Sequence, residues 1–180
     1  MKILNLHGYK GSPENSAKKI LDQFHCYEVL SPALDYDRIL PVQVFAELTQ
    51  IVQEQSPEVL VGTSYGGFFA AALCAKYRIP AILISPCLLP FVHLPRLGCE
   101  WSVREYFPVF SLLSELDVNL TATIIGGKDE IINTHDFTQN FLKNPNFMIH
   151  PDGMHSGATL PLQEFFSKIL KEFSKKYDFK

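Results

Sequence analysis

The sequence predicts an α/β fold with a doubly wound, mostly parallel sheet of about six strands. Strand-like and helix-like segments alternate along the chain, which is the pattern of such folds. The strand-like segments are continuous apolar runs, as expected for a parallel sheet covered by helices on both faces. With 180 residues, 47% of them hydrophobic, the chain is long enough to bury a core. We therefore expect a single domain covering residues 1–180.

The first half of the chain supplies four strand signals and three helix signals. The apolar run 2–6 predicts a buried strand, and residues 14–24 follow with apolar side chains at helical spacing. Residues 27–34 read as an extended segment, after which 41–55 has one apolar helical face and a proline suited to its first turn. The other elements predicted here are a strand at 58–62, a helix at 65–77 and a strand at 81–85.

A long connection separates these elements from the rest of the chain. Residues 86–118 carry four prolines and a cluster of aromatic side chains, and they lie between two predicted strands. Connections of this length are uncommon unless they have a function, so we expect one or two short helices that form a small cap over the strand ends. The elements predicted after it are a strand at 120–127, a helix at 135–142, a strand at 146–150 and an amphipathic helix at 160–177.

Composition argues against several classes of protein. The net charge is -3, whereas a general nucleic-acid binder is normally basic. The four cysteines form no CxxC pair and are expected to be reduced. The longest apolar region, residues 79–92, is interrupted by three prolines and predicts no transmembrane helix, and the N-terminus lacks the pattern of a signal peptide. We therefore expect a cytoplasmic protein that does not insert into membranes.

The clearest motif is the sequence GTSYG, which places Ser64 between Gly62 and Gly66. It follows a predicted strand and opens a predicted helix, the context that a G-x-S-x-G nucleophile elbow requires. A serine at such a turn has a strained backbone that exposes its hydroxyl above the sheet. The flanking glycines avoid collisions at this turn. The motif predicts Ser64 as a nucleophile.

A serine hydroxyl needs a base to take its proton, and the base needs a group that orients it. Asp129 follows the strand predicted at 120–127, and His155 follows the last predicted strand. The chain order Ser64, Asp129, His155 is that of α/β-hydrolase triads, with each residue after its own strand. In parallel α/β sheets the carboxyl ends of the strands form the ligand site.

The loop after the first strand, LHGYKGSP at residues 6–13, suggests an oxyanion hole. Its glycines allow the backbone to turn close to the elbow. The backbone N–H of Tyr9 is the natural donor on this loop, and the N–H of Tyr65 supplies a second one at the start of the helix after Ser64.

These motifs resemble those of the α/β-hydrolase superfamily and, more closely, those of the small bacterial YqiA-like esterases. The matching stretches are LHGYKGSPENSAK, VGTSYGGFFAA, ISPCLLP, GGKDEII and GMHSG. The resemblance implies Ser64 as nucleophile, Asp129 as acid and His155 as base. It also implies esterase chemistry on short acyl chains. The sequence departs from the family in Tyr65, where leucine or methionine is common, and in the length of segment 86–118.

Other polar residues compete for these roles. Glu130, Asp152 and Asp35 are alternative acids, but Asp129 comes first after its strand and Asp152 is too near His155 in sequence to orient its ring. His150 ends an apolar strand and is more suited to local packing. A metal site built from His150, Asp152 and His155 matches no standard ligand spacing. His7 is expected to support its turn, and no pattern singles out the remaining histidines, His25, His93 and His135.

The predicted function is that of a serine hydrolase, a carboxylesterase acting on a small-molecule ester without a metal or organic cofactor. The same residues would serve a thioesterase, an acyltransferase or a lyase, and a catalytically silent binding protein is the alternative from another class. Three aromatic side chains of segment 86–118 are either cap core or the wall of an acyl pocket. They are Trp101, Tyr106 and Phe107.

Overall fold

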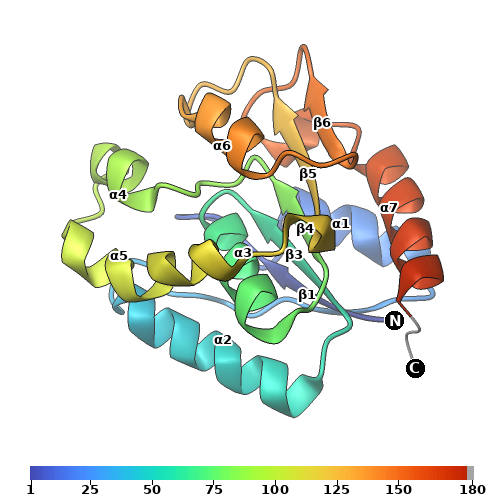
Figure 1. Ribbon diagram of the computed structural model, residues 1–180, viewed down its shortest axis with the longest axis horizontal. Coiled ribbons are helices and arrows are strands. Elements are labelled where there is room, and N and C mark those ends of the chain that lie inside the picture. The colour runs from blue at the N-terminus through green and yellow to red at the C-terminus, as the bar shows by residue number, and fades with distance from the viewer. Residues whose placement is uncertain (178–180) are drawn as a thin grey trace.

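A parallel six-stranded sheet forms the centre of the computed structural model, which describes residues 1–177 (Figure 1). The spatial order of the strands is β2-β1-β3-β4-β5-β6, and every neighbouring pair is parallel. The strands are β1 Lys2–Leu6, β2 Glu28–Leu30, β3 Val59–Thr63, β4 Ala81–Ile84, β5 Thr121–Gly126 and β6 Phe147–His150. This confirms the predicted α/β class and the number of strands.

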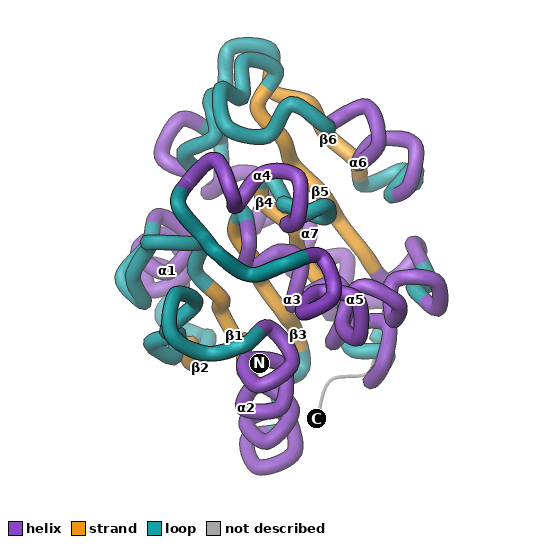
Figure 2. Tube along the Cα trace, turned by 90° about the vertical axis from the view of Figure 1, so that its left-hand side faces the viewer, coloured by secondary structure: helices purple, strands orange, loops and turns teal. Residues whose placement is uncertain are grey.

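Helices cover both faces of this sheet (Figure 2). The helices are α1 Ser16–Leu21, α2 Pro41–Gln55, α3 Tyr65–Tyr77, α4 Pro90–His93, α5 Val103–Phe110, α6 His135–Phe141 and α7 Leu162–Lys176. Alternate strand residues point to opposite faces: Leu4 and Leu60 pack with α2, α3 and α5, whereas Ile3 and Val61 pack with α1 and α7. The two resulting cores fix the carboxyl ends of all six strands along one edge.

Two elements near the N-terminus are shorter than their patterns suggest. Strand β2 covers three residues instead of the expected 27–34, because Pro32 has no N–H to donate to a sheet ladder. The helix expected at 14–24 is divided into α1 and a 3-10 turn, Asp22–Phe24. Asn15 sets the start of α1, since its side chain accepts a hydrogen bond from the backbone N–H of Lys18 at 2.9 Å.

Segment 86–118 forms two helices, α4 and α5, joined by the 3-10 turn Leu94–Leu97. Helix α5 packs against α2 and α3. The part between α4 and α5 contacts the loops after β1 and β2: Lys10 Nζ donates to the carbonyl of Leu97 at 2.7 Å, and Trp101 Nε1 donates to the carbonyl of Tyr36 at 3.1 Å. The segment is thereby tied to two loops at the carboxyl edge of the sheet.

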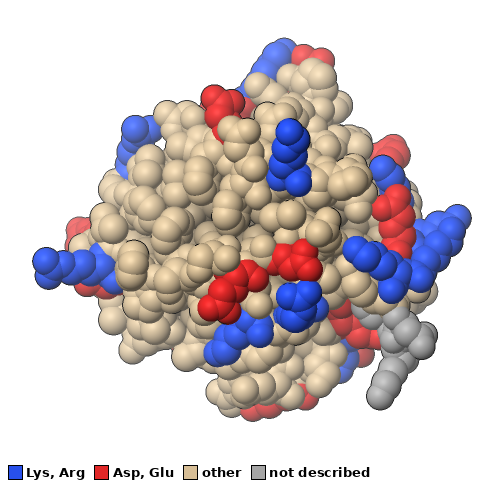
Figure 3. All heavy atoms as spheres, in the orientation of Figure 1, with Lys and Arg blue, Asp and Glu red and all other residues tan. Residues whose placement is uncertain are grey.

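Within residues 1–177, none of the helices combines the length and the apolar character needed to cross a bilayer. All four cysteines are free. On the face shown in Figure 3, acidic and basic side chains are interspersed with larger uncharged areas.

Candidate active site

Ser64 occupies a strained turn between β3 and α3. Its backbone has φ 54° and ψ -120°, a region that residues with side chains rarely adopt. The turn is tight: a Cβ on Gly66 would collide with the carbonyl oxygens of Leu6 and His7, and one on Gly62 would collide with the carbonyl oxygen of Gly66. Backbone packing therefore requires both glycines of the predicted elbow.

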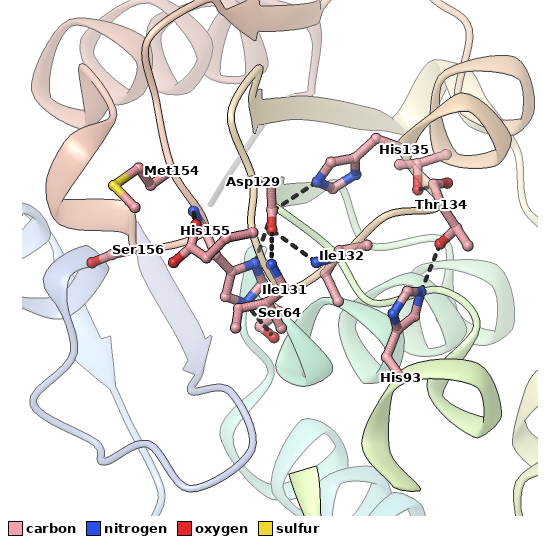
Figure 4. Close-up of polar contacts among 12 residues, drawn as sticks. Ser64, His93, Asp129, Ile131, Ile132, Thr134, His135, Met154, His155 and Ser156 are labelled. Carbon is pink, nitrogen blue, oxygen red and sulfur yellow. Dashed lines mark hydrogen bonds and ion pairs between the residues drawn. The ribbon is translucent and has the colours of Figure 1, made fainter. Parts of the chain in front are cut away.

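A continuous hydrogen-bonded chain joins Ser64, His155 and Asp129 (Figure 4). Ser64 Oγ lies 2.9 Å from His155 Nε2, and His155 Nδ1 lies 2.8 Å from Asp129 Oδ2. The three residues follow β3, β6 and β5, so the sheet brings them together from positions up to 91 residues apart. Because an ionised carboxylate only accepts hydrogen bonds, His155 donates from Nδ1 and turns the lone pair of Nε2 towards the serine hydroxyl.

Asp129 is held as an anion despite its burial, with only 1% of its side chain exposed. Oδ1 accepts hydrogen bonds from the backbone N–H groups of Ile131 and Ile132 at 2.9 and 2.8 Å. Oδ2 accepts from His155 and, at 2.7 Å, from His135 Nε2. Burial alone would raise the pKa of this carboxyl, but the hydrogen bonds from His135, His155 and Ile132 outweigh it and hold the pKa below its ordinary value.

The competing acids occupy other positions. Glu130 accepts a hydrogen bond from the backbone N–H of His155 at 3.0 Å and so supports the loop rather than the ring. Asp152 forms a largely exposed ion pair with Lys128, and Asp35 accepts from the backbone N–H of Arg38. The geometry therefore distinguishes Asp129 from the other carboxyl groups that the sequence offered.

The loop after β1 lies directly against Ser64. A Cβ built on Gly8 would come within 3.0 Å of Ser64 Cβ. Buried His7 supports this turn: its Nδ1 lies 2.8 Å from the Gly8 carbonyl oxygen, and its Nε2 accepts from the Leu34 N–H at 3.1 Å. Burial lowers the pKa of His7, which fits this accepting role.

Two backbone N–H groups near the hydroxyl are available to a ligand. Within residues 1–177, the N–H groups of Tyr9 and Tyr65 have no backbone or side-chain acceptor. That of Tyr65 begins α3, where the first N–H groups of a helix lack intrahelical partners. The Tyr65 ring itself is buried against Tyr36, Phe68 and Phe69. Both amides are thus free to donate a hydrogen bond to a ligand.

A cavity of about 360 Å³ opens at Ser64 and His155. Its walls are the loop after β1, the start of α1 and the loop that carries His155, and they present polar side chains including Ser12, Lys19 and Ser156. An ester group bound here would lie beside the serine hydroxyl, between walls that present both polar and apolar atoms.

The three cap aromatics lie outside the lining of this cavity. Tyr106 is fully buried and its hydroxyl contacts Cys99 Sγ at 3.2 Å, while Trp101 bonds to the Tyr36 carbonyl. Phe107 is 62% exposed and lines a separate apolar cavity between α5 and α6. Helix α5, which carries Tyr106 and Phe107, packs against α2 and α3.

Comparison with known proteins assigns the chain to a family. The model of UPF0227, described as an uncharacterised protein family, matches residues 2–107. The chain belongs to the UPF0227 family. The match includes the loop after β1 and Ser64, whereas Asp129 and His155 follow the matched residues.

Solved structures show the same fold over almost the whole chain. A chain of the metagenome-derived lipolytic enzymes LipS and LipT has a TM-score of 0.74 at 12% identity and covers 97% of this chain and 93% of its own. An α/β hydrolase enzyme from a metagenome of lagoon sediments at Mar Chica, Morocco, has 0.66 at 18%, with 99% and 92% covered. A putative α/β-superfamily hydrolase from Xanthomonas campestris also has 0.66 at 18%, with 95% and 98% covered.

These comparisons confirm the resemblance to α/β hydrolases and, through the family match, to the YqiA-like proteins among them. At such identities the structural likeness establishes the fold of this chain. The chemistry of the site has to be argued from its own residues.

The sequence did not indicate that two histidines, His93 and His135, lie near Asp129. His135 contacts the Asp129 carboxylate, and His93 Nε2 lies 2.8 Å from Thr134 Oγ1, next to His135 in the chain (Figure 4). The only available signal was weak: His135 is the first histidine after Asp129, at the start of a predicted helix.

Proposed function

We propose that this chain is a serine carboxylesterase that cleaves short-chain acyl esters through an acyl-enzyme. The observation that carries the proposal is the hydrogen-bonded chain from Ser64 through His155 to Asp129, which opens into a cavity at the carboxyl ends of the strands. Ester hydrolysis by this route needs a nucleophile, a base and an orienting acid in this order of contact.

In the proposed mechanism, Ser64 Oγ attacks the ester carbonyl carbon while His155 Nε2 takes its proton. Asp129 keeps His155 in the required tautomer and stabilises the ring when it becomes charged. The amides of Tyr9 and Tyr65 donate to the oxyanion of the tetrahedral intermediate, each donor contributing about 3 kcal/mol. His155 then protonates the leaving alcohol as its bond to the acyl carbon breaks. Water next attacks the acyl carbon while His155 takes its proton, and His155 returns that proton to Ser64 Oγ as the acid leaves.

The cavity supports a small substrate. A volume of about 360 Å³ suits an acyl group of a few carbons and a small alcohol, and the mixed wall offers both hydrogen bonds and apolar contacts to such a substrate. The similar structures include an α/β hydrolase enzyme and lipolytic enzymes, which agrees with hydrolysis as the reaction class.

A Ser64→Ala variant tests the proposal with p-nitrophenyl acetate and butyrate as substrates. We expect kcat/KM to fall at least about 10³-fold with the melting temperature unchanged, because the nucleophile is removed and no core contact is lost. Ser174→Ala on α7, outside the cavity, is the matched control and should retain full activity. Wild-type hydrolysis by purified Ser64→Ala protein would refute the proposal.

A further inference from the structure

His135 is the first residue of α6, and its ring points at the carboxylate of Asp129 (Figure 4). Its Nε2 lies 2.7 Å from Asp129 Oδ2, the same oxygen that accepts from His155 Nδ1. Only 14% of the His135 side chain is exposed. We propose that His135 is a positioning residue, which fixes Asp129 in the orientation that His155 needs for catalysis. This inference rests on the proposed esterase function.

The hydrogen bonds of Asp129 explain why a second histidine matters. Oδ1 accepts two backbone N–H groups, from Ile131 and Ile132, and Oδ2 accepts two ring N–H groups. All four principal acceptor directions of the carboxylate are therefore used. Without His135, Oδ2 would retain only its bond to His155. The terminal torsion of an aspartate is broad, so with three bonds in place of four the carboxylate plane would be held less firmly at Oδ2.

A turned carboxylate changes catalysis through His155. The bond from Nδ1 to Oδ2 fixes both the tautomer and the direction of the ring, and so it aims Nε2 at Ser64 Oγ, 2.9 Å away. Hydrogen bonds weaken steeply as their angles depart from linearity. Loss of His135 therefore reduces how often Ser64, His155 and Asp129 are aligned, without removing any of the three.

His135 is itself anchored from segment 86–118. His93, on α4, is buried, and its Nε2 lies 2.8 Å from the hydroxyl of Thr134, the residue before His135. Burial, together with the nearby Arg96 cation, lowers the pKa of His93 and favours its neutral ring. This contact fixes the start of α6 relative to α4. A line of contacts thus runs from His93 through Thr134 and His135 to Asp129 (Figure 4).

A pair of substitutions separates positioning from simple packing. His135→Gln keeps an N–H donor near the place of Nε2, whereas His135→Leu keeps bulk and removes the donor. We expect kcat to fall about 10- to 100-fold in His135→Leu, with KM changed less than about twofold, since misplacing a catalytic group by about 1 Å costs up to 100-fold. His135→Gln should recover kcat to within about threefold of wild type. His25→Leu, at an exposed histidine outside the site, is the control.

A second measurement tests whether the effect passes through Asp129. The rate at which a fluorophosphonate labels Ser64 is compared in wild type, His135→Leu, Asp129→Ala and the double variant. His135→Leu should slow labelling in the wild-type background and have no further effect once Asp129 is replaced. If His135→Leu does not fold, His135→Asn, whose shorter side chain cannot reach Oδ2, takes its place.

Three results would overturn the inference. They are wild-type kcat in folded His135→Leu, equal losses in the leucine and glutamine variants, and an undiminished effect of His135→Leu in the Asp129→Ala background. Each is distinct from failure of the proposed function, which would appear as hydrolysis that survives Ser64→Ala.

Discussion

The elbow around Ser64 and the two loops that carry Asp129 and His155 are held in place by different interactions. At the elbow, backbone atoms approach so closely that Gly62 and Gly66 leave no room for a Cβ. The loops after β5 and β6 are instead joined by side-chain hydrogen bonds centred on Asp129. The nucleophile is thus positioned by close packing of backbone atoms, whereas the acid and base are positioned by side-chain hydrogen bonds. This difference predicts different responses to mutation.

The largest expected effect is the loss of activity when the hydrogen bonds of Asp129 are changed. Asp129→Asn places an amide where His155 needs an acceptor and so favours the wrong tautomer of the ring. We expect kcat for p-nitrophenyl butyrate to fall about 10⁴-fold while the circular dichroism spectrum stays that of the wild type. A loss below about tenfold would mean that Asp129 does not orient His155.

The second effect is a loss of stability when the close backbone packing at the elbow is disturbed. Gly66→Ala introduces a Cβ against the carbonyl oxygens of Leu6 and His7, and neither backbone can move without disturbing the sheet. We expect the free energy of unfolding, measured with urea, to fall by about 2–3 kcal/mol. This would occur although alanine favours a helix over glycine by about 1 kcal/mol.

Gly157→Ala is the matched control for that substitution. Its new Cβ would meet only side-chain atoms, the nearest being Leu162 Cδ1 at 3.3 Å. We expect the free energy of unfolding to change by less than about 1 kcal/mol. Similar losses at both glycines would show that the elbow is no tighter than the loop after β6.

A smaller effect appears in the pH dependence of stability. The pKa of Asp129 is lowered in the folded protein, so the charged carboxylate stabilises the fold fully above the ordinary carboxyl pKa of about 4. As the pH falls below about 5, the unfolded chain takes up the proton first and this contribution decreases. The stability of the wild type should therefore fall relative to that of Asp129→Asn as the pH decreases from 5 to 3. A difference that is constant throughout would contradict the lowered pKa.

The smallest effect is expected for the exposed ion pair between the same two loops. Lys128 Nζ lies 2.6 Å from Asp152 Oδ1, but both side chains are largely exposed to solvent. Lys128→Ala should change the free energy of unfolding by less than about 0.5 kcal/mol and leave kcat unchanged. A larger loss would show that the loops depend on surface charge as well as on the buried bonds of Asp129.

The same comparison explains how much could be predicted from the sequence. The elbow is a local motif, so residues 62–66 with their flanking strand and helix are enough to identify it. The strands could be recognised because each is a continuous apolar run. The limits of β2 and α1 could not, because they depend on one proline and on the cap that Asn15 provides.

Prediction was weaker wherever tertiary contacts decide. Chain order pointed to Asp129 and His155, but no motif marks His93 or His135. The contact of His93 spans 41 residues, and that of His135 depends on how the chain between β5 and α6 folds back on Asp129. The aromatic residues of segment 86–118 are equally suited to a core or a pocket wall. Only the packing of α5 on α2 and α3 shows that Tyr106 belongs to the core.

The central claim is that Ser64 is an activated nucleophile, and covalent labelling tests it most directly. Purified protein is treated with a fluorophosphonate, and the adduct is located by peptide mapping and mass spectrometry. We predict a single adduct on Ser64 that is lost in His155→Ala, because the hydroxyl needs the base 2.9 Å away. A folded protein without an adduct, or one labelled equally in His155→Ala, would contradict the account.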